Sequence, residues 1–156
     1  MDNLYETDAV LWAERQADAL RRHAHDEIDW KNVAGEIQDV GNWHRDRIKS
    51  RLATLCALLL KWQFQPERRS GSWRGSIAHN RNRIEQVTED YPSLRSHPAN
   101  VLMKSYGAGR RVVMAETGLT DLPDACPWSI EQILDHGFGR ASNGSPGFFA
   151  SLAPAA

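Results

Sequence analysis

The chain has 156 residues, of which 41% are apolar and 25% are charged, and its formal net charge at pH 7 is -1. A chain of this length and composition can form one hydrophobic core without disulfides or metal ions, so we expect a single domain. The only cysteines are Cys56 and Cys126, which argues against a disulfide framework and favours a reducing compartment.

Neither a secretory signal nor a membrane span is expected. The first ten residues, MDNLYETDAV, begin acidic and lack the basic segment and apolar run of a signal peptide. The longest apolar run, Leu52 to Leu60, is about half of the ~20 residues that a spanning helix needs. We therefore expect a cytoplasmic protein with no membrane contact.

Charge is distributed unevenly along the chain. Residues 1–43 carry ten acids and four bases, a net charge of -6, whereas residues 44–83 carry ten bases and two acids, a net charge of +8. Residues 84–156 carry eight acids and five bases, a net charge of -3. This polarity favours charge pairing within the chain or between subunits, or else a basic surface for an anionic partner.

The first predicted helix runs from about Asp8 to His23, with Thr7 as its N-cap. The apolar face of this helix is expected to contain Ala9, Trp12, Ala13, Gln16, Ala19 and Leu20. The segment HAHDEID then breaks the pattern, and Asp29 can cap the next helix.

The second predicted helix, from Trp30 towards Phe64, has the clearest periodicity in the chain. Apolar positions recur every three or four residues at Val33, Ile37, Val40, His44, Ile48, Leu52, Leu55, Leu59 and Trp62. Gly35 and Gly41 each weaken a helix by about 1 kcal/mol relative to alanine, which predicts a bend or a break nearby. The segment from Leu52 to Leu60 is apolar almost all round, so it is expected to be buried on most sides.

Pro66 ends the second helix, and a third is predicted from Ser72 or Trp73 to Tyr91, where Pro92 stops it. We expect the second and third helices to form an antiparallel hairpin that turns near Glu67. Residues whose numbers sum to about 135 then lie opposite each other, which places Trp62 against Trp73.

Two more helices complete the predicted fold. One runs from Pro98 to Thr117 with Gly118 after its end, and a short one runs from Pro127 to Gly137. The sequence thus predicts an all-α, single-domain bundle of about five helices over residues 1–137. Residues 138–156 are rich in Gly, Ser, Ala and Pro and are expected to form a flexible tail.

The stretch KWQFQPERRSGSWRGSI, from Lys61 to Ile77, is the candidate site. In a structural interpretation, the two tryptophans close the end of the hairpin and an arginine guanidinium stacks on an indole. In a functional interpretation, the start of the third helix binds an anion or a protein partner. The candidate contact residues are Arg68, Arg69, Ser70, Ser72, Trp73 and Arg74.

Other chemistry-bearing residues give weaker patterns. His23, His25 and Asp26 resemble metal ligands, but residues two apart point to different sides of a helix. Cys56 and His79 fall opposite each other in the hairpin, although burial of Cys56 would raise its pKa and oppose thiolate chemistry. We therefore assign no catalytic residue, metal ligand or cofactor.

The order of motifs resembles the bacterial family catalogued as domain of unknown function 29, over about residues 4–136. The matching stretches are YETDAVLWAERQADALRR, IDWKNVAGEIQDVG, LLLKWQFQPERRSGSWRGSI, DYPSL and CPWSIEQILD. The resemblance implies a small, all-α, cytoplasmic protein and carries no known reaction or cofactor. Relatives often have a histidine where this chain has Leu58, so no catalytic or metal-binding role transfers to that position.

These observations favour a non-enzymatic helical interaction protein, self-associating or bound to another protein. Its expected contact surface is the tryptophan and arginine stretch or the long second helix. The alternative is a protein that binds a nucleic acid or a phosphate-bearing ligand through the basic segment 44–83. No nucleic-acid-binding motif accompanies that segment. If Arg68, Arg69 and Arg74 are all paired with acids of the same chain, the structural interpretation of the stretch is favoured. If they converge on open solvent or on a bound anion, the functional interpretation is favoured.

Overall fold

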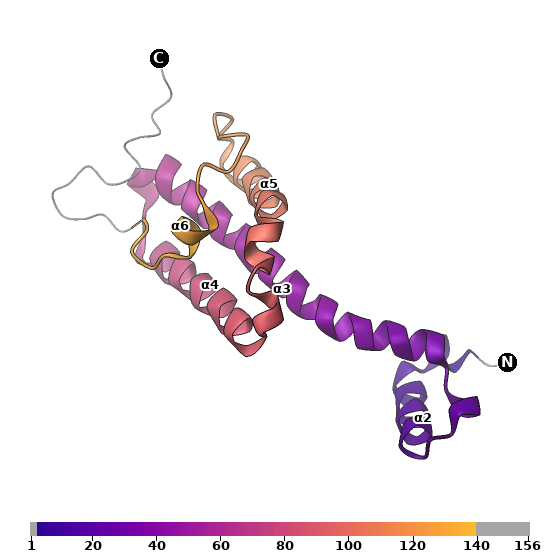
Figure 1. Ribbon diagram of the computed structural model, residues 1–156. Coiled ribbons are helices and arrows are strands. Elements are labelled where there is room, and N and C mark those ends of the chain that lie inside the picture. The colour runs from indigo at the N-terminus through magenta and orange to yellow at the C-terminus, as the bar shows by residue number, and fades with distance from the viewer. Residues whose placement is uncertain (1–2, 140–156) are drawn as a thin grey trace. The chain divides into compact units, whose positions relative to one another are not determined.

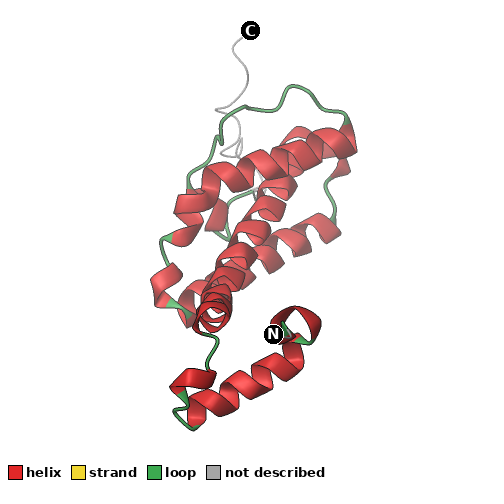
Figure 2. Ribbon diagram, turned by 90° about the vertical axis from the view of Figure 1, so that its right-hand side faces the viewer, coloured by secondary structure: helices red, strands yellow, loops and turns green. Residues whose placement is uncertain are grey.

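The computed structural model describes residues 3–139, and these form helices and loops without any strand (Figure 2). The predicted all-α class is confirmed. Contacts divide the chain into two compact units, an N-terminal unit that ends at His44 and a C-terminal unit that begins at Arg45. Helix α3, Trp30–Phe64, contributes residues to both. Across residues 3–139 no helix is both long and apolar enough to cross a bilayer.

The N-terminal unit is formed by α1 (Leu4–Thr7), α2 (Ala9–Arg21), the 3-10 helix η1 (His25–Glu27) and the start of α3. Asp8, rather than the predicted Thr7, caps α2, because its carboxylate accepts a hydrogen bond from the Leu11 amide. The small core of this unit contains Trp12, Ala19, Ile28 and Val33. Ala9, Ala13 and Leu20 were predicted on the buried face of α2 but are exposed.

Helix α3 runs without interruption through Gly35 and Gly41 for 35 residues, so the predicted break is absent. Its length is about 50 Å at ~1.5 Å per residue. Asp29 caps it as predicted, accepting a hydrogen bond from the Asn32 amide. The cost of two glycines, about 1 kcal/mol each, is small beside the burial of the C-terminal half of the helix. Leu52, Leu55, Trp62 and the five consecutive residues from Cys56 to Leu60 are buried.

The C-terminal unit packs α4 (Gly71–Asp90) and α5 (His97–Thr117) against the C-terminal half of α3 (Figure 1). The 3-10 helices η2 (Pro66–Arg68) and η3 (Pro92–Leu94) make the turns, and α6 is Ile130–Leu134. Gly118 ends α5 in the left-handed conformation with φ of 73°, as the sequence predicted. The core combines residues of all four helices with Trp128 and Phe138.

The predicted hairpin of α3 and α4 is present, with a register close to the expected one. Arg51 Nη1 lies 3.5 Å from Asn80 Oδ1, and the Lys61 ammonium lies over the Trp73 ring. These pairs sum to 131 and 134, near the predicted 135. The hairpin therefore turns where Pro66 ends α3 and Ser70 caps α4 by accepting a hydrogen bond from the Trp73 amide.

Helix α6 is shorter than predicted. Ser129 and Gln132 form a reciprocal capping box, so the helix begins after Ser129 and not at Pro127. Its last turn is held by buried Arg81 of α4, which donates to the carbonyl oxygens of Ile133 (2.7 Å) and Phe138 (3.1 Å). Burial of a guanidinium is tolerated here because backbone oxygens satisfy it.

The predicted flexible tail, residues 138–156, falls mostly outside the described residues. Phe138 is described, and its ring is buried against Trp128 in an edge-to-face arrangement with centroids 6.2 Å apart. Residues 140–156 lie outside the described range. The flexibility of that segment stays a prediction.

Helices α3 and α5 approach each other closely at Gly109. A Cβ atom at this position would lie 2.5 Å from the Ala53 carbonyl oxygen and 3.0 Å from the Ala57 amide nitrogen. Both atoms belong to the α3 backbone and cannot move aside. Nearby, the Ser105 hydroxyl donates to the Lys49 carbonyl oxygen at 3.0 Å and joins the same two helices.

Gly109→Ala should destabilise the C-terminal unit by about 1–3 kcal/mol, because the added methyl group must push two helices apart. Gly107→Ala is the matched control: it lies in the same helix, and its Cβ would meet only the Arg111 guanidinium at 3.7 Å. Alanine there should raise stability by up to about 1 kcal/mol through helix propensity. Urea unfolding measures both, and equal effects of the two substitutions would contradict the close approach.

Candidate functional site

Trp62, in the last turn of α3, is the centre of the predicted site. Its indole is buried, and the Arg69 guanidinium lies over it, 5.1 Å from the ring centroid. Arg69 Nε also donates to the Trp62 carbonyl oxygen at 2.8 Å. That oxygen is in the last turn of α3 and has no partner within the helix, so Arg69 acts as a C-terminal cap.

The second arginine of the stretch, Arg74, also lies over Trp62, with its guanidinium carbon 6.0 Å from the ring centroid. Trp73 is contacted by a different cation, the Lys61 ammonium, at 5.8 Å. Lys61 additionally forms an ion pair with Glu116 of α5 at 2.6 Å. Over residues 3–139, no ring contact joins Trp62 to Trp73, so cations on the indoles take the place of the expected tryptophan pair.

The remaining candidate residues are spread over the surface of the corner. The Ser70 hydroxyl accepts from the Trp73 amide and is thus occupied by the helix cap. Arg68 and Ser72 are exposed, at the end of η2 and in the first turn of α4. Two of the three arginines therefore stabilise the hairpin by stacking on Trp62. A ligand-binding role for the stretch stays a prediction.

Cys56 and His79 do not form a catalytic pair. The Cys56 side chain is completely buried, and burial raises the pKa of its thiol, which opposes formation of the nucleophilic thiolate. His79 is exposed on α4. The hairpin register places positions 56 and 79 opposite each other along α3 and α4. The two side chains nevertheless lie on different faces of the hairpin.

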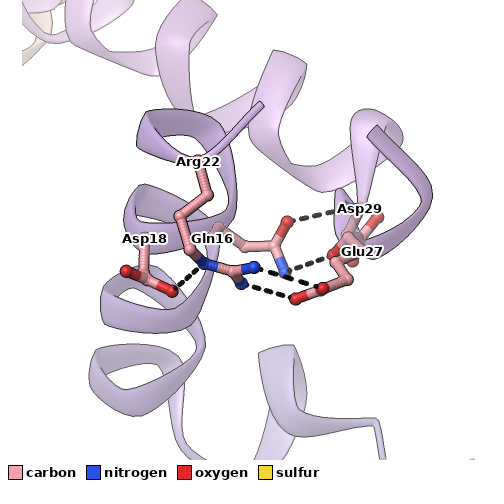
Figure 3. A network of polar contacts seen from close by, with 5 residues as sticks. All are labelled: Gln16, Asp18, Arg22, Glu27 and Asp29. Atoms are coloured by element: carbon pink, nitrogen blue, oxygen red, sulfur yellow. Dashed lines mark hydrogen bonds and ion pairs between the residues drawn. The ribbon is translucent and has the colours of Figure 1, made fainter. Parts of the chain in front are cut away.

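An open cleft of about 750 Å³ lies in the N-terminal unit, and Arg22 and Glu27 are among its lining residues. Figure 3 shows the polar network that Arg22 forms with its neighbours. The Arg22 guanidinium pairs with Asp18 at 2.7 Å and with Glu27 at 2.7 Å. The hydrogen bonds from Arg22 hold the pKa of Glu27 below its ordinary value. Because these carboxylates and Arg22 already bind each other, the network ties α2 to η1 and has a structural role.

Gln16 completes this network (Figure 3). Its side-chain oxygen accepts from the Asp29 amide at 2.7 Å, and its side-chain nitrogen donates to the Glu27 carbonyl oxygen at 3.3 Å.

The ring of His25 stacks on Trp30 with centroids 6.1 Å apart. Residues 3–139 contain no cluster of three or more His, Cys, Asp or Glu side chains arranged to hold a metal ion.

An apolar surface is exposed on the N-terminal half of α3, the long helix that the sequence offered as one of two expected contact surfaces. We call it the α3 face and define it as Trp30, Ile37, Val40 and Trp43. Their exposed fractions are 55%, 67%, 65% and 56%. The apolar periodicity of the helix continues through this segment, but only Val33 of it enters the core of the N-terminal unit.

The position of the α3 face on the helix follows from ~100° per residue. Ile37, Val40 and Trp43 are three residues apart, so each lies about 60° from the next around the axis. Trp30 precedes Ile37 by two turns and lies on nearly the same side of the helix. Four large apolar side chains therefore make one continuous stripe. Charged residues lie between these apolar residues in the sequence. They indicate that the apolar arc around the helix is narrower here than between Leu52 and Leu60.

Comparison with known families places the chain in one of them. The model of the domain of unknown function DUF29 matches residues 4–139, nearly all of the described chain. The chain therefore belongs to the DUF29 family, as its motifs had indicated. No curated protein and no solved structure matches the chain. The family assignment supports the helical fold and carries no activity.

Arg69→Gln should destabilise the hairpin by about 1–2 kcal/mol, because it removes the hydrogen bond to Trp62 and the stacked cation. Arg68→Gln removes the same charge from the adjacent position, where the side chain is exposed, and should change stability by less than about 0.5 kcal/mol. Urea unfolding measures the difference. A loss as large for Arg68→Gln as for Arg69→Gln would contradict the structural role of Arg69.

Proposed function

We propose that this chain is a non-enzymatic helical interaction protein that binds its partner through the α3 face. The observation that carries the proposal is the exposure of Ile37 and Val40, about two-thirds of each side chain, in the middle of a helix. Isolated exposed apolar residues are ordinary on protein surfaces, whereas a continuous stripe is typical of an interaction site.

The area of the α3 face supports the same function. An aromatic side chain presents about 150–250 Å², so Trp30 and Trp43 together leave roughly 200 Å² in water at the exposures given above. Ile37 and Val40 add a comparable area. The sum approaches the largest apolar patch that a monomeric protein usually carries, about 300–600 Å².

The shape of the α3 face favours a helical partner. The apolar side chains follow spacings of three and seven residues, which is the pattern of a helix that packs along one other helix. Exposed polar residues, including Gln38 and Asp39, occupy the other sides. A partner that covers the stripe therefore needs to supply one apolar ridge, as in helix-in-groove recognition.

The alternative function is binding of an anionic ligand or a nucleic acid through the basic segment. The exposed charges of Arg68 and Arg74 near the start of α4 favour it, since helix N-termini attract anions. Against it, Arg69 and Arg74 already stack on Trp62. We place it second for this reason.

A photo-crosslinking amino acid at position 40 of the full chain should form covalent adducts in the cells that produce it. The same amino acid at position 38 is the control, because Gln38 is exposed and lies about 160° from Val40 around the helix. Gel electrophoresis detects the covalent adducts. The proposal requires adducts at position 40 that are absent at position 38, and equal or no crosslinking at both positions would overturn it.

Binding to mixed-sequence DNA and RNA at low salt tests the alternative. If the basic segment is the site, affinity should fall with added salt, and the double substitution of Arg68 and Arg74 by Gln should weaken it about tenfold or more. Replacing Arg95 and Arg111 by Gln removes the same charge outside the segment and should have a smaller effect. Fluorescence anisotropy measures both, and no binding by the wild-type chain would exclude this alternative.

A further inference from the structure

We infer that the partner of the α3 face is a protein with a cationic amphipathic helix, whose apolar ridge is flanked by lysine or arginine side chains. The inference rests on the proposed function, since it names the chemistry of the molecule that covers the same surface. The charge around the α3 face carries it. The face and the charges beside it lie in the N-terminal unit, where residues 1–43 have a net charge of -6.

One border of the α3 face is acidic. Glu36 and Asp39 are exposed, and at ~100° per residue they lie about 20° and 40° from Trp43 around the helix, on its two sides. Lys31 is the only Lys or Arg of α3 before residue 45, and it lies about half a turn from Val40. The charges of α3 that border the face are therefore all negative.

The two carboxylates keep their charge at this border. Glu36 Oε1 accepts a hydrogen bond from the Tyr5 hydroxyl at 2.7 Å, and Asp39 Oδ1 accepts one from the Asn42 side-chain amide at 3.2 Å. Both donors are neutral, and within residues 3–139 neither carboxylate forms an ion pair. A cation of the partner can therefore pair with each of them, and charges around an apolar contact select the partner that binds.

The other border of the α3 face is small and uncharged. Ala34 and Gly41 lie there, about 40° and 20° beyond Trp30 around the helix. Small side chains let a second helix approach closely, so the apolar ridge of the partner can pack against this side of the stripe. The stripe from Trp30 to Trp43 is about 20 Å long, which corresponds to about four helical turns of the partner.

The same charges disfavour two other occupants. A second copy that covers the face with its own face sets acids beside acids in either helix direction, because Glu36 and Asp39 lie near the middle of the stripe. Helices that lie on anionic membranes have Lys and Arg on their polar face, whereas the border here is acidic. A helix with basic borders complements both the apolar stripe and the carboxylates.

Two synthetic helical peptides of about 18 residues test the inference with the full chain. Both have leucine at heptad positions a and d; lysine flanks the leucines in the cationic probe, and glutamate replaces lysine in the acidic probe. Fluorescence anisotropy should give a dissociation constant of roughly 10–100 μM for the cationic probe. The acidic probe should bind at least about tenfold more weakly. No binding of the cationic probe, or equal binding of both, would contradict the inference.

Val40→Ser tests whether the cationic probe binds on the α3 face. It should weaken binding about fivefold, because it removes a methyl-bearing side chain from the middle of the contact. Val10→Ser is the matched control: Val10 is 71% exposed, close to the 65% of Val40, but lies on α2 outside the face. It should change the affinity by less than about twofold. Equal weakening by the two substitutions would place the probe elsewhere and exclude the inference.

Glu36→Gln combined with Asp39→Asn tests the acidic border. Each new side chain keeps an oxygen that can accept the hydrogen bond of the wild type, so the charge is what is lost. Binding of the cationic probe should weaken about tenfold. Glu14→Gln combined with Asp26→Asn removes the same charge from exposed positions on α2 and η1 and should have less than about a threefold effect.

Far-ultraviolet circular dichroism checks that every variant remains helical. Equal effects of the two double substitutions would attribute the attraction to the net charge of the unit, and the inference would be wrong.

Other occupants and the proposed function have separate outcomes. Dimers of the wild-type chain at about 100 μM that Val40→Ser abolishes would identify a second copy, and vesicle binding that Val40→Ser abolishes would identify a lipid surface; either result excludes the inference. If position 40 forms adducts in cells but the cationic probe binds no better than the acidic one, the interaction function stands and the inference fails. If position 40 forms no adducts, the interaction function itself is overturned.

Discussion

The continuity of α3 is the constraint on which the rest of the structure depends. One helix of 35 residues supplies Val33 to the core of the N-terminal unit and Ile48 through Trp62 to the core of the C-terminal unit. Because the hydrogen bonds of the helix continue through Gly35 and Gly41, the segment between these contributions stays helical. The side chains of that segment are consequently held in a fixed stripe, with Ile37 and Val40 in water.

The corner at the end of α3 shows how an arginine-rich stretch can serve the fold. Pro66 stops the helix, which leaves its last carbonyl oxygens without helical partners. Arg69 binds one of them and covers the Trp62 indole, and Arg74 reaches the same ring from α4. Cations on aromatic faces also keep their charge accessible to solvent, so the corner is both cohesive and basic.

Much of the fold followed from local sequence signals. Asp29, Pro66 and Gly118 mark helix boundaries through capping and backbone geometry, which depend on few residues. The all-α class and the hairpin of α3 and α4 could be predicted from the sequence for the same reason. The start of α4 was predicted at Ser72 or Trp73 and lies at Gly71, after the cap Ser70. The end of the short α6 could not be predicted from local signals, because it is set by Arg81, a residue about 50 positions earlier in the chain. The structural corner at Pro66 could be predicted, but which cation covers which indole depends on side-chain packing across the turn, and a binding role for the candidate site stays a prediction.

The first half of α3 shows what apolar spacing alone leaves open. Apolar residues spaced three and four apart predict that one face of a helix is covered. The spacing does not show whether the same chain or another molecule covers that face. The arc of apolar residues adds that information. Between Leu52 and Leu60 it extends almost all round the helix, which requires neighbours on several sides and hence the interior of one domain. Between Trp30 and Trp43 it is a single stripe with charges inside it, and one further helix is enough to cover it. The width of the apolar arc around a helix therefore indicates how many neighbours are needed to cover it, and a narrow stripe needs only one.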